Sequence, residues 1–340
     1  HGATAEAGLA GLLGWWTGIN GGDFDNDGDI DYLVTNFGLN TKYKATVEAP
    51  ELLYYGDVEG TGRSHLIEAG FEDGVLYPHR GFSCSRSAMS SLGVKLKTYH
   101  GFASSKLAEV YSPDRLRGAQ RFEASTLETG VLINDGGAKF RFRPLPRMAQ
   151  IAPAFGSAIF DANADGNLDI YLVQNFFGPQ IETRPMDGGL SVLLVGNGKG
   201  GFLPVPARGS GLVVAQDAKS LAMTDLAGDG RPDLVIGVND GPVLVFDNLG
   251  SALPISVRLA GPRGNPSGIG ARVTLEFGNG AQRVGEITAG GGYLSQSPPR
   301  LYFSPPQGRR AEKISVRWPD GKTTSAAIGQ QSREVLVKYE

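Results

Sequence analysis

The sequence predicts an all-β protein whose main part is a β-propeller, with a small β-sandwich at its C-terminal end. Two observations support this fold class. Fifty of the 340 residues are glycine and 20 are proline, without a three-residue period, which is typical of short strands joined by tight turns. An aspartate-rich turn also recurs along the chain, and each copy leads into an apolar run. Recurring turn–strand units indicate four-stranded sheets arranged around an axis.

Three copies of the turn align without gaps over twelve positions, starting at Asp23, Asp161 and Asp225. Oxygen-bearing side chains dominate positions 1, 3, 5 and 9, glycine occupies position 6, and an apolar run begins at position 10. A fourth stretch, residues 57–67, keeps the length and the glycine but has Thr61 and His65 in place of aspartate. We interpret it as a degenerate copy.

The chain is expected to divide into propeller blades over residues 1–250 and a sandwich over residues 251–340. Residues 77–127 lose the strand pattern and are predicted to form a partly helical insertion between two strands of one blade. About four blades can be counted. Four blades are few for a closed wheel. We therefore expect that further blades precede the chain, that partner copies complete the wheel, or that the blade number is unusual. The sandwich strands are expected to be antiparallel and to cover residues 271–277, 313–318 and 335–339.

The three intact turns are predicted to bind Ca²⁺. Hard cations take six to eight oxygen ligands, and alternate side chains of a tight turn can point such oxygens inward. An EF-hand is excluded because it needs a glutamate at position 12 and flanking helices, whereas position 12 is Val34, Leu172 or Ile236. Ordinary Asp/Gly turns are the alternative, but three copies in the same phase disfavour it.

Two to three Ca²⁺ sites are expected, and position 7 of each contributes its backbone carbonyl. Ranked by ligand charge, the first loop should bind most tightly. The third should bind most weakly, because Ala227 leaves position 3 without an oxygen. The candidate ligands are Asp23, Asp25, Asp27, Asp29 and Asp31 in the first loop, Asp161, Asn163, Asp165, Asn167 and Asp169 in the second, and Asp225, Asp229, Arg231 and Asp233 in the third.

Composition excludes several classes of partner. The net charge is −3, from 32 basic and 35 acidic residues, and there is no basic stripe, so nucleic acid is not an expected partner. No apolar run approaches the ~18 residues of a membrane-spanning helix. Cys84 is the one cysteine, which excludes an internal disulfide and a cysteine-based zinc site.

Other candidate sites lie mainly in the 77–127 insertion. Cys84 has His79 and His100 nearby in sequence, which is the minimum for a thiol nucleophile, but no local signature supports catalysis and an incidental cysteine is favoured. Trp15 and Trp16 either stack on a sugar or, as we favour, pack in the blade core. Five arginines either bind an anion or, as we favour, form a solvated face; they are Arg80, Arg86, Arg115, Arg117 and Arg121.

The aspartate loops resemble the calcium loops of FG-GAP/VCBS repeats, the blades of integrin-α-type propellers. The C-terminal segment resembles the ASPIC/UnbV domain at residues 269–273, 290–296 and 316–321. The combination is similar to the cartilage-acidic-protein-like family. This resemblance implies a secreted, extracellular or periplasmic protein whose blades are made rigid by calcium.

We therefore expect a non-enzymatic module for recognition or adhesion, with a protein or glycan at a surface as its partner. Two alternatives stay open. One is a cyclase- or lyase-like enzyme with its site at the propeller face under the insertion. The other is a structural subunit of an extracellular assembly, in contact with copies of itself or with other subunits.

Overall fold

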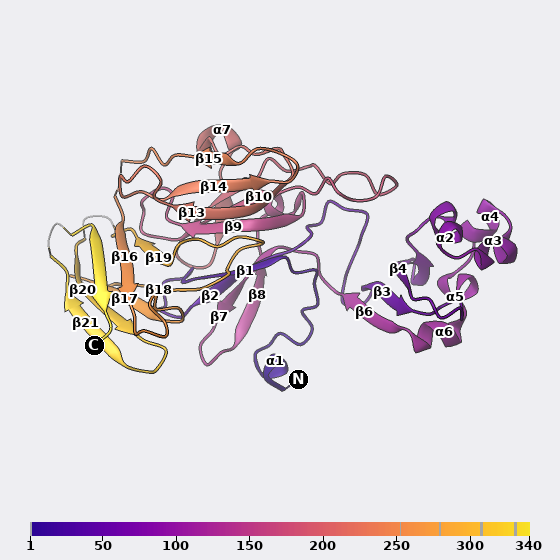
Figure 1. Cartoon of the computed structure of the whole chain (residues 1–340), viewed down its shortest axis with the longest axis horizontal. Coiled ribbons are helices and arrows are strands. Elements are labelled where there is room, and N and C mark those ends of the chain that lie inside the picture. Colours follow the sequence, from indigo (N-terminus) through magenta and orange to yellow (C-terminus); the bar gives the residue numbers. More distant parts are fainter. Residues whose placement is uncertain (1, 252, 279, 307–308, 330–331) are drawn as a thin grey trace. The chain divides into compact units, whose positions relative to one another are not determined.

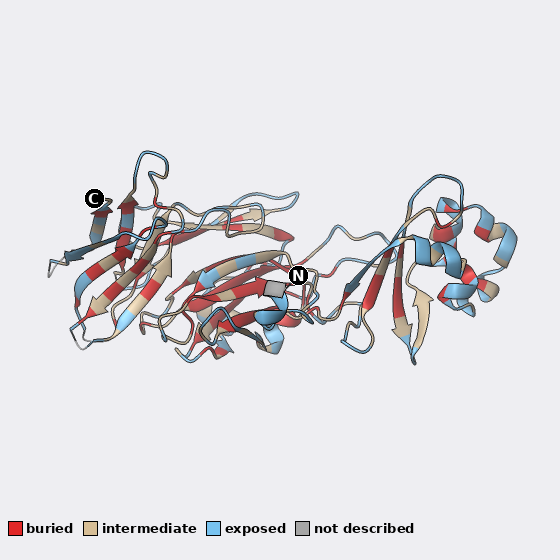
Figure 2. Cartoon of the chain, turned by 90° about the horizontal axis from the view of Figure 1, so that it is seen from below, coloured by how far each residue is buried: buried red, intermediate tan, exposed pale blue. Residues whose placement is uncertain are grey.

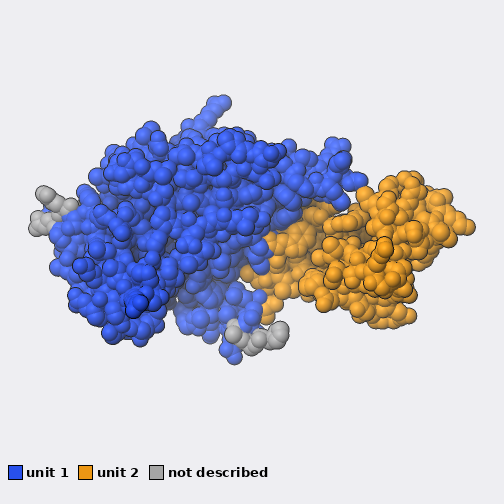
Figure 3. All heavy atoms as spheres, viewed as in Figure 1, with its two compact units in different colours: residues 1–9, 16–40, 128–340 blue, residues 10–15, 41–127 orange. Residues whose placement is uncertain are grey.

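The structure is a computed structural model that describes residues 2–251, 253–278, 280–306, 309–329 and 332–340. It consists mostly of β-strands with a few short helices. None of the described helices is long and apolar enough to span a bilayer. The chain forms two compact units (Figure 3), one of residues 1–9, 16–40 and 128–340 and the other of residues 10–15 and 41–127.

The larger unit begins with three antiparallel sheets, and each of them contains one aspartate loop. The first has the order β1 (Gly18–Gly22), β2 (Asp31–Thr35), β7 (Gly130–Asn134), β8 (Phe140–Pro144). The second contains β9 (Ala154–Phe160), β10 (Asp169–Gln174), β11 (Val192–Gly196) and β12 (Phe202–Pro204). The third contains β13 (Ala218–Thr224), β14 (Asp233–Val238) and β15 (Leu244–Phe246). Short helices in this unit are α1 (Gly2–Glu6), η1 (Arg147–Gln150) and α7 (Ala207–Ser210).

The three aspartate loops occupy equivalent places in these sheets. In each sheet the loop connects the first two strands, which form an antiparallel hairpin. The residue before the loop pairs with the aspartate at position 9, and the pairs are Gly22 with Asp31, Phe160 with Asp169, and Thr224 with Asp233. The sequence repeat is therefore also a repeat in strand register.

Strand β10 explains how the sheets pack, because it is buried along its whole length; Figure 2 shows in red the buried residues, many of which lie on strands. Successive side chains of a strand point to opposite faces. Ile170 and Leu172 join one core with side chains of the first sheet, while Tyr171 and Val173 join a second core with side chains of the third. The middle sheet is therefore covered on both faces (Figure 1). The described strands form separate sheets, none of which closes on itself.

The C-terminal part of this unit consists of two further sheets. One has the order β19 (Arg300–Phe303), β16 (Ile255–Ala260), β22 (Glu334–Lys338), and the other β18 (Gln282–Glu286), β17 (Arg272–Phe277), β20 (Ala311–Arg317), β21 (Thr323–Ala327). Both contribute to one core around Val257, Leu275 and Trp318. The expectation of a purely antiparallel sandwich is wrong, because β22 pairs in parallel with β16. Strand β22 follows β21 of the second sheet in the sequence but pairs with β16 of the first sheet. The chain therefore crosses from one sheet to the other before β22, and this route sets the direction of the strand.

The smaller unit contains the degenerate copy of the turn. Its sheet has the order β5 (Val75–Pro78), β4 (His65–Glu72), β3 (Glu51–Gly56), β6 (Gln120–Ala124). The helices between β5 and β6 are α2 (Phe82–Ala88), α3 (Ser91–Leu96), α4 (Tyr99–Ala103), α5 (Leu107–Val110) and α6 (Pro113–Gly118). They share a core with β3 and β4 that includes Leu52, Ile67 and Phe102. Five short helices thus lie within the 77–127 stretch that was predicted to be partly helical, between two strands of one sheet, and this sheet belongs to a separate compact unit.

Candidate metal centre

A β-strand follows each aspartate loop, beginning at Asp31, Asp169 and Asp233. This confirms the prediction from sequence and excludes an EF-hand, in which a helix would follow. Glycine is needed at position 6 because the backbone there has φ near +90°, which side chains rarely allow: the values are 94° at Gly28, 89° at Gly166 and 87° at Gly230.

The aspartate at position 9 fastens each loop to its sheet. Asp31, Asp169 and Asp233 are almost fully buried, and both oxygens of each accept a backbone N–H. One donor is the second residue of the loop and the other lies at or just after the end of the third strand. The donors are Phe24 and Asn134, Ala162 and Gly196, and Leu226 and Asn248, all at 2.8 Å. A carboxylate oxygen has two lone pairs, so each oxygen of Asp31 and Asp169 retains one for a cation, whereas Asp233 Oδ2 also accepts the N–H of Ala227 at 3.4 Å.

Asn134 and Asn248 were missed as part of the site. A signal for both is present in the sequence, because each follows a short apolar run and is followed two residues later by a glycine, Gly136 or Gly250. Their side-chain amides also donate to the carbonyls of Ile30 and Pro232, the residues immediately before the position-9 aspartates.

The first loop brings three carboxylates together. One carboxylate oxygen from each of Asp23, Asp25 and Asp27 lies within 4.8 Å of the others. Asp23 is 3% exposed. Its Oδ2 accepts the N–H of Gly28 at 3.1 Å, whereas its Oδ1 is buried and has no hydrogen-bond partner. A buried acceptor without a donor is unfavourable, and a cation among the three carboxylates would satisfy it.

The pKa shifts in the first loop also favour a cation bound among its carboxylates. Burial, assisted by the charge of Asp31, raises the pKa of Asp23 to about 7. Burial also raises the pKa of Asp31 to about 6, and burial together with Asp27 raises the pKa of Asp25. These groups resist ionisation because water is excluded and their charges repel. A divalent cation would reverse both effects.

The remaining residues of the first loop make contacts outside it. The Asp29 carboxylate lies 3.5 Å from the Arg272 guanidinium on β17. The Asn26 amide donates to Asn167 Oδ1 at 3.0 Å and thereby joins the first loop to the second. The side chains at position 7 are thus used for contacts between elements, which leaves their backbone carbonyls as the predicted ligands.

The second loop is partly satisfied by its own amides and by the C-terminal sheets. The Asn163 amide donates to Asp165 Oδ2 at 3.1 Å, and the Gly166 carbonyl accepts the Nε–H of Arg283 at 2.6 Å. Burial raises the pKa of Asp161, while a hydrogen bond with Ser304 acts in the opposite direction. Burial raises the pKa of Asp169 to about 6.

The third loop already contains a cation. The Arg231 side chain donates to the Asp229 carboxylate and, through Nε, to the Asn248 carbonyl at 2.8 Å. Ala227 supplies no oxygen at position 3. The guanidinium therefore offsets part of the negative charge that would attract Ca²⁺.

Sequence patterns did not identify the basic side chains that the C-terminal sheets place at the loops. A cavity of about 100 Å³ lies between the first two loops and strands β18 and β19, and its lining includes Asp23, Asp161, Arg283 and Tyr302. Burial lowers the pKa of Arg283, and the charges of Asp23 and Asp161 oppose this shift. No local pattern could reveal these contacts, because they join residues more than 100 positions apart.

The other candidate residues are separated by the fold. His79 hydrogen-bonds Glu51 at 2.5 Å, and Cys84 lines a cavity with His65, a histidine that the sequence had not associated with it. Trp15 packs edge-on against Tyr43 in the smaller unit, and Trp16 against Phe142 in the larger one. Both tryptophans are half-buried; they were expected to pack in the blade core, and neither is among the buried core residues.

The fold and the loops define a mostly β protein with acidic hairpin connections. Residues 261–340 match the protein-family model described as ASPIC and UnbV, which confirms the resemblance of the C-terminal segment. No match was found among curated proteins. Among solved structures, the chain is similar to the V. cholerae biofilm matrix protein Bap1 at 11% identity and a TM-score of 0.18. That alignment covers 88% of this chain and 63% of the other, and the TM-score is too low to define a common fold.

Proposed function

We propose that this protein is an exported, non-enzymatic recognition module built on FG-GAP/VCBS-type propeller blades, in which structural Ca²⁺ occupies the aspartate loops. The observation that carries the proposal is the buried, unpartnered Oδ1 of Asp23 beside two converging carboxylates. The same turn in three sheets with one register supports a common role for the loops.

Calcium fits these loops better than magnesium. The first loop offers several carboxylates in an irregular turn, whereas Mg²⁺ demands near-octahedral geometry and retains its waters. Sites of this kind in extracellular modules bind Ca²⁺ at roughly 10⁻⁴–10⁻³ M, which suits the calcium concentration outside the cytosol. This is the reason for proposing an exported protein.

Bound Ca²⁺ would have a structural role, holding the aspartate loops against the C-terminal strands. The loops stand where the sheets meet the C-terminal strands, with Arg272 beside Asp29 and Arg283 beside Gly166. Neutralising the crowded carboxylates would stabilise the hairpin turns and this contact together. Such a role needs no bound substrate and no catalytic group.

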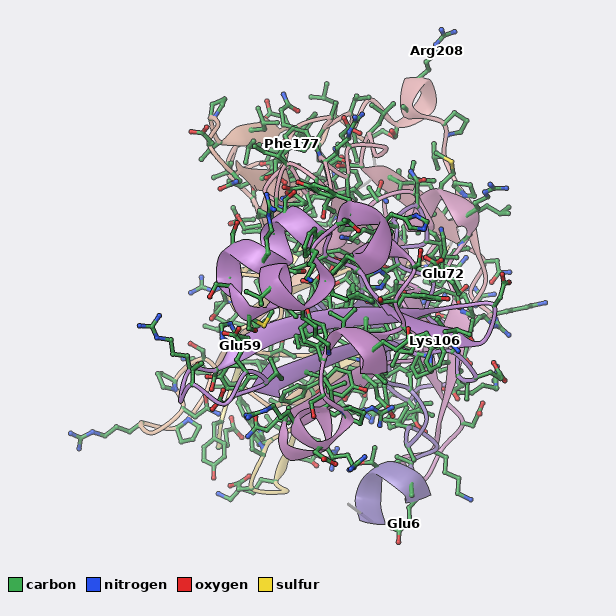
Figure 4. All side chains as sticks on the ribbon, turned by 90° about the vertical axis from the view of Figure 1, so that its right-hand side faces the viewer. Glu6, Glu59, Glu72, Lys106, Phe177 and Arg208 are labelled. Atoms are coloured by element: carbon green, nitrogen blue, oxygen red, sulfur yellow. The ribbon has the colours of Figure 1, made fainter. Side chains whose placement is uncertain are left out.

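The connection between β10 and β11, residues 175–191, supports a role in recognition. Its apolar side chains Phe177 (labelled in Figure 4), Ile181 and Leu190 are 42%, 92% and 48% exposed. Long connections that present apolar groups to solvent are typical of contacts with partners. We propose a protein or glycan at a surface as the partner.

The proposal is tested by calcium-dependent stability. Removal of divalent ions with EGTA should lower the melting temperature, and Ca²⁺, but not an equal concentration of Mg²⁺, should restore it. Asp27→Ala should lose more of this stabilisation than the matched variant Asp229→Ala, because Arg231 already neutralises Asp229. A melting temperature indifferent to Ca²⁺, or the reverse order of the two variants, would contradict the proposal.

A further inference from the structure

The smaller unit contains a cavity of about 280 Å³ that is separate from the three intact aspartate loops and is lined in part by the degenerate copy, residues 57–67. It lies between the sheet and helix α2, beside Arg80, His65, Ser85, Tyr111 and Met89. Figure 4 looks onto this unit and labels Glu59, a neighbour of His65. The volume is close to the lower limit of roughly 300 Å³ for small-molecule sites.

Two polar nitrogens at this cavity are buried without a hydrogen-bond partner: Arg80 Nε and His65 Nε2. A guanidinium nitrogen can only donate. Glu59 Oε2 lies 3.5 Å from His65 Nε2, which is too long for a normal hydrogen bond. Arg80 Nε is therefore a free N–H donor, and His65 Nε2 is one in the tautomer that carries its proton there. In the first aspartate loop, by contrast, the unpartnered atoms are the oxygens of Asp23 and Asn26, which suit a cation.

The guanidinium of Arg80 is only partly engaged. Its Nη2 lies 3.5 Å from Glu68 Oε1, a long contact, and Glu68 also accepts the hydroxyl of Tyr43 at 3.3 Å. The edge of a guanidinium that contains Nε is where a carboxylate binds with two parallel hydrogen bonds.

Arg80 differs in this respect from the other arginines considered from the sequence. Arg86 stacks on Phe82, Arg117 pairs with Asp114, Arg121 pairs with Glu123, and Arg115 is exposed and contributes to lowering the pKa of Asp57.

The rest of the cavity wall is largely apolar. Ile67 and Met89 are buried, and Leu66, Pro78 and Ala88 complete this surface. The buried Ser85 hydroxyl donates to the Arg80 carbonyl at 3.4 Å, so it already has a partner. The site thus combines free N–H donors with an apolar wall, as expected for a ligand with an acidic head and an apolar body.

We propose that this cavity binds a small monocarboxylate with an apolar body, whose carboxylate accepts hydrogen bonds from Arg80 and His65. The ligand would lie between the sheet and helix α2, within the smaller unit. The site does not depend on the calcium loops, so its failure would leave the function proposed above intact.

The test is calorimetric titration of the full chain with phenylacetate, and with phenylacetamide as the uncharged probe of the same shape. Phenylacetate should bind, and phenylacetamide should bind at least roughly tenfold more weakly, since a hydrogen bond to a charged group is worth more than a neutral one. Arg80→Gln should weaken phenylacetate binding by a similar factor. Arg117→Gln, an exposed arginine on α6, is the matched control and should not change it.

A second variant tests the same site independently, in case Arg80→Gln does not fold. Ala88→Phe adds a ring from the exposed wall of the cavity and should abolish binding while the thermal unfolding transition is retained. The proposal is overturned if wild-type protein does not bind phenylacetate at millimolar concentration, if both probes bind equally, or if binding survives Arg80→Gln or Ala88→Phe.

Discussion

The first aspartate loop and residues 57–67 have the same turn, but the pKa of the first aspartate is raised in one and lowered in the other. In both, the first aspartate accepts the N–H of the glycine at position 6, Gly28 or Gly62. Asp57 also accepts the N–H groups of Gly60 and Thr61, and its pKa is lowered most by the bond from Gly62 and further by these two. Burial raises the pKa of Asp23 to about 7, and its Oδ1 has no donor.

The difference shows what changes an aspartate turn into a cation site. Backbone donors satisfy Asp57, and Thr61 and His65 replace the carboxylates that the other copies have at positions 5 and 9. Asp23 is buried, and Asp25 and Asp27 crowd its unpartnered oxygen. The turn geometry is thus a property of the repeat, whereas the need for a cation arises from burial and neighbouring charge.

The largest expected effect is a pH dependence of stability in the metal-free protein. Burial raises the pKa of Asp23, Asp31 and Asp169 from 3.8 to about 7, 6 and 6. The folded state then retains protons that the unfolded chain releases, so stability is full below about pH 4 and falls as the pH rises toward 7. Each unit of raised pKa corresponds to about 1.4 kcal/mol.

Urea unfolding of metal-stripped protein at about pH 5 and about pH 8 measures this fall, and Ca²⁺ should reverse it at the higher pH. Asp57→Asn is the control. The pKa of Asp57 is lowered, so its contribution is already complete at pH 5 and the substitution should leave the fall intact. If the metal-free protein is as stable at pH 8 as at pH 5, ionisation of the carboxylates costs no more in the first loop than in residues 57–67, and the comparison fails.

A smaller effect is expected for Asp31→Asn. The substitution replaces one of two oxygens that accept buried backbone N–H groups, and an unsatisfied buried group costs about 1–3 kcal/mol. The free energy of unfolding of the Ca²⁺-loaded protein, in which the ion offsets the charge of Asp31, should therefore fall by about that amount. Asp29→Asn, which affects one ion pair with Arg272, should cost less than ~1 kcal/mol. Equal losses for the two variants would refute the fastening role of position 9.

The smallest effect concerns the third loop. Arg231→Gln removes the cation paired with Asp229, so Ca²⁺ affinity should rise by roughly two- to fivefold, as expected for losing a partly exposed ion pair. Calorimetric Ca²⁺ titration in an Asp27→Ala background isolates the weaker loops. Arg258→Gln removes the same charge from an exposed pair with Glu334 and should leave the affinity unchanged. Unchanged affinity in Arg231→Gln would remove the proposed reason for the weakness of this loop.

Local patterns were enough to locate the hairpins and the helical insertion. Asp31, Asp169 and Asp233 begin strands as predicted, because glycine at φ near +90° and an alternating or apolar run are properties of a few adjacent residues. The parallel pairing of β22 with β16 was not foreseen. Strand direction depends on the route of the chain between sheets, and no pattern within a strand encodes it.

The residue types and their spacing were therefore sufficient to identify repeated acidic turns leading into strands, since turn geometry is local. Tertiary packing had to supply the burial of Asp23, the donors that satisfy Asp31, and the placement of Arg283 beside Gly166. It also had to bring His65 and Arg80 to one cavity. Solvent exclusion and long-range charge depend on which segments pack together, and distances along the chain do not reveal that.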